Sequence, residues 1–305
     1  MDLRASFVPE ANELRGLSLC AGYGGLDLGL HIAEPAYRTV GYVEREAHAA
    51  SALVGRMADA ALAEAPIWDD LRSFDGRPWR DRVHIVSAGY PCQPFSYAGR
   101  RRGEADPRHL WPEVARIVDE AQPEWVFCEN VEGHLSMGYT DVARDLRGLG
   151  YEPKAGLFTA REAGARHRRR RLFILAHADR KRRGVRAGHP TSGRAVSAPV
   201  TVRRGGAQRG AVRAQRFNEG LDPSLDHLTG ARLGASADDF LFAPGPGELQ
   251  AWARLLHLQP DAQPAVLRTD DGMADRVDRT RGVGNGVCSM AAALAWAVLK
   301  SAHGV

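Results

Sequence analysis

The chain has 305 residues, of which 44% are hydrophobic and 26% are charged, and its formal net charge is +4. This length suffices for one large domain or two, and the composition is that of a folded protein, which excludes wholesale disorder. No apolar run reaches the ~18–20 residues of a membrane span, and the N-terminus lacks a signal-peptide core, so we expect a cytoplasmic protein.

From Leu14 to about His177, short apolar runs alternate with amphipathic stretches. The runs predicted to form strands are Leu17–Cys20, Thr39–Val43, His84–Ala88, Trp125–Cys128 and Leu172–Leu175. The stretches predicted to form helices are Ala47–Leu62, Leu110–Ala121 and Thr140–Leu149. Strands that alternate with helices of this length predict an α/β fold with a doubly wound, mostly parallel sheet.

A glycine-rich turn, Ala21–Gly25, follows the first predicted strand. Glycines allow a sharp strand-to-helix turn and a close approach of the backbone to a ligand. The spacing differs from the dinucleotide fingerprint, which disfavours NAD. Because Glu44 ends the second predicted strand, where a ribose-binding carboxylate belongs, we favour a nucleoside cofactor over a purely structural turn.

Cys92 lies between two prolines in Gly89–Ser96, directly after the third predicted strand. The prolines prevent a strand or helix from continuing through the thiol, so Cys92 is expected on a loop at the carboxyl ends of the strands, where ligands bind. Cys20 and Cys128 are predicted core residues within strands. The four cysteines show neither a disulfide framework nor metal-site spacing, and we expect no metal.

The positive charge is concentrated in residues 161–216, which contain 17 Lys and Arg residues but only two acids, Glu162 and Asp179. This segment carries +15 and the rest of the chain −11. Its part from Arg180 to about Arg216 has almost no large apolar residues and is predicted to be a flexible loop. Composition alone leaves a solvated linker and a polyanion-binding surface equally open. Val287–Lys300 is predicted to form a final, buried helix.

Taken in order, these motifs resemble those of the cytosine-5 DNA methyltransferase family. The matching motifs are the Ala21–Gly25 turn, Glu44, Asp70-Leu71, Pro91-Cys92-Gln93, Glu129-Asn130-Val131, the arginine run Arg168–Arg171, and Gly284-Asn285-Gly286-Val287. They extend over nearly the whole chain. The resemblance implies a Rossmann-like, S-adenosylmethionine-dependent enzyme, of the bacterial or phage modification type, that methylates carbon 5 of a flipped-out cytosine in duplex DNA.

The resemblance also implies roles for four catalytic residues. Cys92 would add to carbon 6 of the cytosine, which turns carbon 5 into a nucleophile. Glu129 would bind ring nitrogen 3 and the exocyclic amine, and a raised pKa would suit that role. Arg171 would contact the 2-oxygen, with Arg169 supporting the active-site loop.

The implied cofactor is S-adenosylmethionine, whose methionine part would lie on the glycine turn. Glu44 would bind the ribose, Asp70 and Leu71 would lie near the adenine, and Asn285 would close the pocket. Ser18 stands where the family usually has aspartate. The predicted cofactor-binding residues are Cys20, Ala21, Gly22, Tyr23, Gly24, Gly25, Leu26, Glu44, Asp70, Leu71, Gly89, Pro91 and Asn285.

The expected organisation is a catalytic domain formed by residues 14–177 and 280–302, with a target-recognition region at 178–279 that begins with the arginine- and glycine-rich segment. We expect a monomer that acts on double-stranded DNA and has no membrane partner. Two alternatives remain open, namely an RNA cytosine-5 methyltransferase and a non-catalytic DNA-binding relative. In the light of the resemblance, DNA contact is the favoured role of the basic segment.

Overall fold

A computed structural model describes residues 13–91, 110–165, 167–178 and 286–304, together with four positions between 250 and 257. Cys92, Asn285 and nearly all of the segment 178–279 lie outside the described residues. Within the described part, no helix is both long and apolar enough to cross a membrane.

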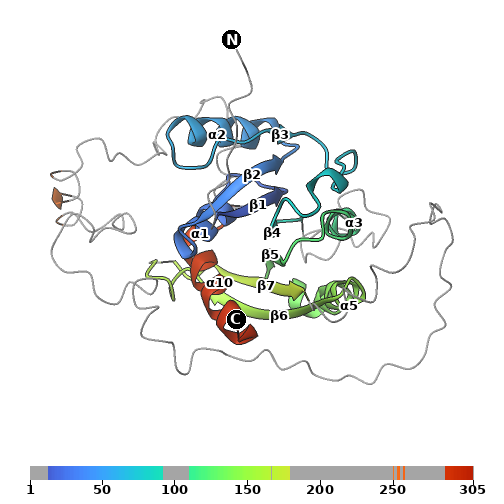
Figure 1. Cartoon of the computed structure of the whole chain (residues 1–305). Coiled ribbons are helices and arrows are strands. Elements are labelled where there is room, and N and C mark those ends of the chain that lie inside the picture. Colours follow the sequence, from blue (N-terminus) through green and yellow to red (C-terminus); the bar gives the residue numbers. More distant parts are fainter. Residues whose placement is uncertain are drawn as a thin grey trace, which may run out of the picture.

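Seven strands form one sheet in the order β3-β2-β1-β4-β5-β7-β6 (Figure 1). The strands are β1 (Leu14–Leu19), β2 (Tyr37–Val43), β3 (Ile67–Trp68), β4 (Ile85–Ala88), β5 (Trp125–Val131), β6 (Tyr151–Thr159) and β7 (Arg170–Ala178). The pairs among β1 to β5 are parallel, whereas β7 runs antiparallel to both of its neighbours. The predicted α/β fold with a mostly parallel, doubly wound sheet is therefore confirmed.

The helices cover both faces of the sheet (Figure 1). Within residues 13–91, 110–165, 167–178 and 286–304, the helices are α1 (Gly25–Ala33), α2 (Ala47–Ala58), α3 (Trp111–Ala121), α4 (His134–Met137), α5 (Tyr139–Gly148) and α10 (Ser289–His303), with a short 3-10 turn, η1 (Arg77–Trp79). Residues of α3 and α5 share one buried cluster with alternate residues of β1, β4, β5 and β7. Residues of α1 and α10 share a second cluster with the intervening strand residues, as the two-residue strand period requires.

The C-terminal helix α10 packs on α1, although 255 residues separate them in the chain. Gly29 permits this contact, because a Cβ atom at that position would lie 2.6 Å from the Cβ of Ala292. Gly25 similarly faces the carbonyl of Val287, at 2.7 Å from where its own Cβ would be. These close approaches place the segment that precedes α10 directly against the glycine turn.

Several predicted boundaries are wrong by a few residues. The helix predicted over Ala47–Leu62 ends at Ala58, and the strand predicted over Trp125–Cys128 continues to Val131, so Glu129 lies inside β5. Cys20 lies just past β1, with a left-handed φ of 50°, and not within the strand. Strands β3 and β6 were not predicted.

Candidate active site

A cavity of about 750 Å³ opens at the carboxyl ends of β1, β2, β4 and β5. In a doubly wound sheet this edge is where ligands bind, because the strand order reverses there. Its lining comes from these strand ends, from the loop after β3, and from Gly286 and Val287 before α10. The volume lies within the range of small-molecule and cofactor sites.

The glycine turn forms one wall of the cavity. Its backbone passes through three left-handed residues, Cys20, Gly22 and Gly24, with φ values of 50°, 55° and 70°. A Cβ atom on Gly22 would have no neighbour within 4 Å, so its backbone borders open space. A Cβ atom on Gly24 would lie only 2.4 Å from Leu62. Gly22 thus faces the cavity, whereas Gly24 allows the turn to pack on the core.

The carboxylate of Glu44 is fixed by backbone amides. The amide of Gly22 donates to Oε2 and the amide of Glu46 donates to Oε1, both at 2.7 Å. Charge-assisted bonds of this kind are strong and hold the side chain in one orientation. Glu44 therefore joins the glycine turn to the end of β2, and it does so on the lining of the cavity.

Beneath the turn, the buried carboxyl of Asp27 on α1 accepts four hydroxyl hydrogen bonds. Ser18 donates to Oδ2 at 2.8 Å, while Tyr37, Thr39 and Ser87 donate to Oδ1 at 3.1, 3.2 and 3.4 Å. Burial raises the pKa of Asp27, and the bonds from Ser18, Tyr37 and Thr39 oppose that shift. This cluster ties α1 to β1, β2 and β4.

The strand β4 leads into Gly89, Tyr90 and Pro91, all three of which line the cavity. The side-chain amide of Asn130 donates to the carbonyl of Tyr90 at 3.2 Å, and the Tyr90 hydroxyl lies 3.0 Å from Nε2 of buried His134. These bonds hold the chain in place just before Cys92. The predicted nucleophile itself lies outside the described residues.

Cys20, which also lines the cavity, is unsuited to be the nucleophile. Burial, followed by the nearby charge of Glu44, raises the pKa of its thiol to about 12. Burial likewise raises the pKa of the Cys128 thiol. Since the thiolate is the reactive form, both groups are unreactive near neutral pH.

Glu129 on β5 and Arg171 on β7 also line the cavity. Their Oε1 and Nε atoms form an ion pair at 3.0 Å, and Glu129 is only 8% exposed. Burial raises the pKa of Glu129 to about 7, even though the charges of Arg171 and Arg169 act to lower it. A carboxyl with a pKa near neutrality can hold or release a proton during a reaction.

Arg169 is near enough for its charge to act on Glu129, but it does not line the cavity. Its backbone has a left-handed φ of 27°, and its Nη2 atom donates to the carbonyl of Gly286. Burial lowers the pKa of Arg169, and the neighbouring charge of Arg171 adds to that effect. Arg169 therefore ties the start of β7 to the segment that leads into α10.

The cavity brings most of the predicted residues together. Those on its lining are Cys20, Ala21, Gly22, Tyr23, Gly25, Leu26, Glu44, Asp70, Leu71, Gly89, Pro91, Glu129 and Arg171. Gly24 and Arg169 lie close by without lining it, and Cys92 and Asn285 lie outside the described residues. Within the described ranges, no three His, Cys, Asp or Glu side chains are grouped so as to hold a metal ion.

The cavity also includes residues that were not predicted, among them Ser18, Arg45, Arg72, Tyr90, Asn130 and Val131. Each is a close sequence neighbour of a predicted residue. Their sequence positions beside the predicted strand ends could have identified them, since several residues around each strand end lie at the same edge of the sheet.

The fold and the site thus define a doubly wound α/β protein with a ligand cavity at its strand ends. A model of the C-5 cytosine-specific DNA methylase family matches residues 14–197, and the chain belongs to this family.

Among curated relatives, the chain is 32% identical over 168 residues to the type II methyltransferase M.NgoMIV of Neisseria gonorrhoeae, covering 54% of this chain and 52% of that protein. It is 34% identical over 166 residues to M.CviJI of Paramecium bursaria Chlorella virus IL3A, covering 53% and 42%. The chain thus spans about half the length of these relatives.

Among solved structures, similarity extends to a mutant form of Spodoptera frugiperda DNMT2, with 18% identity and a TM-score of 0.47. That match covers 55% of this chain and 51% of the other. A putative DNA modification methyltransferase encoded within an Escherichia coli prophage has 23% identity and a TM-score of 0.45, with 54% and 47% covered.

Proposed function

We propose that this protein transfers a methyl group from S-adenosylmethionine to carbon 5 of a flipped-out cytosine in duplex DNA, at a specific sequence. The observation that carries the proposal is the cavity at the strand ends, whose lining includes both the fixed carboxylate of Glu44 and the buried acid Glu129. Membership in a family of S-adenosylmethionine-dependent methyltransferases supports it.

The residues present fit the cofactor. The backbone of Gly22 borders open space where any larger residue would intrude, and helix α1 begins at Gly25, directly after the turn. The Glu44 carboxylate is oriented as an acceptor for hydroxyl groups such as those of a ribose. When bound, S-adenosylmethionine supplies an electrophilic methyl group. The turn from Cys20 to Leu26, with Glu44, Asp70 and Leu71, would hold it.

The reaction proposed for the cytosine requires covalent help, because carbon 5 is a poor nucleophile. The Cys92 thiolate would add to carbon 6, and the electron pair of the 5,6 double bond would shift into an enamine that makes carbon 5 nucleophilic toward the methyl group that S-adenosylmethionine would supply. Loss of the proton on carbon 5 and expulsion of the cysteine restore the double bond. The net products are 5-methylcytosine, S-adenosylhomocysteine and one proton.

Glu129 would stabilise this addition by donating a proton or a hydrogen bond to ring nitrogen 3 as negative charge builds up on the ring. Its pKa of about 7 means that a substantial fraction is protonated at neutral pH. Arg171, 3.0 Å from Glu129, would hold both the carboxyl group and the 2-oxygen of the base. The two side chains reach the cavity from adjacent antiparallel strands.

The organisation proposed for the whole chain assigns residues 14–177 and 280–302 to catalysis and 178–279 to target recognition. The arginines between 180 and 216 would then contact DNA phosphates or bases. Removing them should weaken binding and flatten the decrease in affinity with salt concentration.

The direct test is to incubate the protein with S-adenosylmethionine and duplex DNA of diverse sequence, and to map modified cytosines by bisulfite sequencing. Cys92→Ala should abolish modification, whereas Cys288→Ala, a half-buried cysteine off the cavity lining, serves as the matched control. Unmodified DNA across all sequences, or equal activity of Cys92→Ala, would contradict the proposal. A parallel reaction with transfer RNA tests the RNA alternative.

A duplex that contains 5-fluorocytosine gives a second readout. Fluorine cannot leave as the proton does, so the wild-type protein should remain covalently attached to the DNA. A protein that methylates DNA without being trapped would exclude addition by Cys92, and a protein that binds DNA without either outcome would favour a non-catalytic relative.

A further inference from the structure

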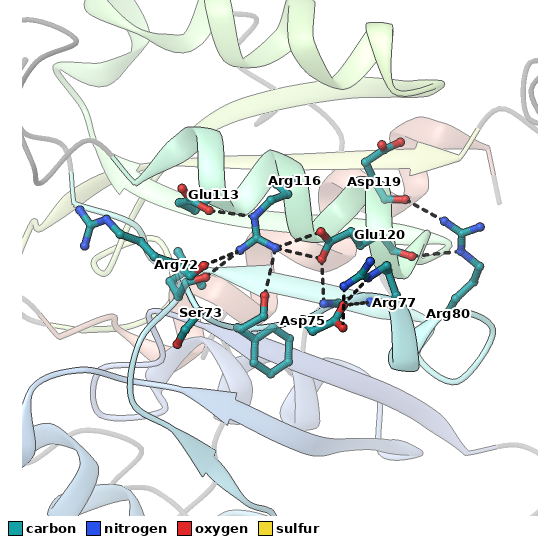
Figure 2. Close-up of polar contacts among 12 residues, drawn as sticks. Arg72, Ser73, Asp75, Arg77, Arg80, Glu113, Arg116, Asp119 and Glu120 are labelled. Atoms are coloured by element: carbon teal, nitrogen blue, oxygen red, sulfur yellow. Dashed lines mark hydrogen bonds and ion pairs between the residues drawn. The ribbon is translucent and has the colours of Figure 1, made fainter. Parts of the chain in front are cut away.

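The side chain of Arg116 on α3 holds the loop that follows β3, and it does so from outside the cavity (Figure 2). Its Nη2 atom donates to the carbonyls of Leu71 at 2.9 Å and of Arg72 at 3.5 Å. Its Nη1 atom donates to the carbonyl of Phe74 at 3.0 Å. One guanidinium group thus donates hydrogen bonds to three backbone carbonyl groups of a single turn.

Two carboxylates of α3 orient this guanidinium group. Glu113 accepts from Nε at 2.8 Å, and both oxygens of Glu120 accept from Nη1 at about the same distance, 3.0 and 2.9 Å. Only the planar, five-donor fork of arginine can serve all these acceptors at once, because lysine has a single nitrogen. These carboxylates therefore fix the orientation in which the guanidinium group of Arg116 contacts the loop.

Glu120 also binds the loop directly, because its Oε2 accepts a hydrogen bond from the backbone amide of Gly76 at 2.8 Å. The loop lies so close to the helix here that a Cβ atom on Gly76 would be 3.0 Å from Glu120 and 3.1 Å from the carbonyl of Ile117. Arg116 and Glu120 together bind three carbonyls and one amide of the loop backbone between residues 71 and 76.

The other side of the same loop faces the cavity, which Asp70, Leu71 and Arg72 line. The loop is tightly turned, since the carbonyl of Asp70 accepts bonds from both the amide and the hydroxyl of Ser73. These bonds link Asp70 to the same short turn that Arg116 holds at Leu71 and Phe74. The loop borders the cavity beside Glu44, whose amide donates to the carbonyl of Trp68 at 2.9 Å.

We propose that Arg116 is a positioning residue for the cofactor: by holding the carbonyls of Leu71 and Phe74, it sets the place of Asp70 and Leu71 against the adenosine part of the ligand. The inference rests on the proposed function, in which this part of the cavity holds S-adenosylmethionine. Arg116 itself does not line the cavity, so it acts only through the loop.

The test compares Arg116→Met and Arg116→Lys with Arg144→Met in the full chain. Arg144 is a matched control, because it likewise pairs with two acids of its own helix, Asp141 and Asp145 on α5, but it belongs to a helix that does not hold the loop after β3. Calorimetric titration with S-adenosylhomocysteine and with adenosine measures binding well below each variant's melting temperature. Steady-state methylation of DNA separates KM for S-adenosylmethionine from kcat.

Arg116→Met should raise the dissociation constants of S-adenosylhomocysteine and adenosine by the same factor, about tenfold, since contacts that orient a binding group from behind are typically worth that much. Arg116→Lys should lie between Arg116→Met and wild type, while Arg144→Met matches wild type. KM should rise with the dissociation constant, and kcat at saturating cofactor should stay within about twofold, because the reacting groups lie elsewhere in the cavity.

A lower melting temperature with unchanged ligand affinity would show that Arg116 is merely structural and would overturn the inference. A loss for S-adenosylhomocysteine without any loss for adenosine would also overturn it, because the effect would then lie at the methionine end. Should Arg116→Met fail to fold, Arg116→Lys decides by the same criterion. If the wild-type protein itself binds no S-adenosylhomocysteine, the proposed function fails and not this inference alone.

Discussion

Asp27 and Glu129 are two buried carboxyl groups in the same protein with opposite surroundings. Asp27, which is 1% exposed, lies beneath the glycine turn, where four hydroxyl groups donate to its two oxygens. Glu129, which is 8% exposed, lies on the cavity wall, where Arg171 forms an ion pair with Oε1. Within the described part of the chain, Arg171 is the one polar partner of that oxygen.

Burial raises the pKa of both groups, so the pKa alone does not separate structure from function. The hydrogen-bonding partners of the two carboxyl groups distinguish the structural one from the functional one. The oxygens of Asp27 are saturated by hydroxyls from three strands, which favours a structural role for the carboxyl group. Glu129 retains bonding capacity directed at a cavity, which favours a role with a ligand. Four predictions test this contrast.

The largest effect is expected for Glu129→Gln. The amide keeps the size of the side chain but cannot transfer a proton, so kcat for DNA methylation should decrease at least about 100-fold. Bisulfite mapping or transfer of a labelled methyl group measures this. Asp27→Asn is the matched control and should retain most of the activity; equal losses in the two variants would remove the distinction between the groups.

The pH dependence of the wild-type protein should also identify Glu129. Its pKa of about 7 predicts that kcat/KM declines as pH rises above 7, because the protonated fraction is lost. Because its pKa is higher in the folded protein than in the unfolded chain, protonation of Glu129 stabilises the folded state. This stabilisation is complete below the unfolded-state pKa of ~4.5 and is lost as pH rises through 7. Rate profiles and denaturation between about pH 4 and 9 check both; a declining limb retained in Glu129→Gln would assign it to another group.

Asp27 should matter for stability. Asp27→Leu leaves four buried hydroxyls without their acceptor and should lower the free energy of unfolding by about 3 kcal/mol or more. Asp27→Asn keeps an acceptor and avoids a buried charge. Because the folded pKa of Asp27 is raised, Asp27→Asn should be at least as stable as wild type at about pH 8, with a difference that shrinks toward about pH 4. Urea denaturation at both pH values measures this.

The smallest effect is expected for Ser18→Ala, which removes one of the four donors to Asp27. The free energy of unfolding should decrease by about 1 kcal/mol, the usual value of one hydrogen bond. Ser136→Ala, which removes a hydroxyl bond on an exposed residue, is the control and should change stability by less. A loss for Ser18→Ala as large as that for Asp27→Leu would mean that the other three hydroxyls contribute nothing.

Much of the fold could be predicted because its strands are continuous apolar runs, as buried parallel strands are. The two missed strands lack that signal. β3 has only two residues, and β6 contains Pro153 and Gly156, which are unusual inside strands. The predicted strand Trp125–Cys128 stops before Glu129, because the apolar run ends at Cys128. Pairing with β7 continues the strand to Val131, and thereby buries the carboxyl.

The sequence by itself determined the sheet of alternating elements, the glycine turn, the acid after β2 and the family motifs, since each depends on residues close together in the chain. Only the tertiary structure decided how distant groups meet. It placed Arg171 against Glu129, collected the hydroxyls of three strands around Asp27, and brought α3 to the loop at 71–76. The bond from Arg116 to Leu71 spans 45 positions and that from Ser87 to Asp27 spans 60. The energies of such contacts depend on burial and geometry that no local pattern encodes.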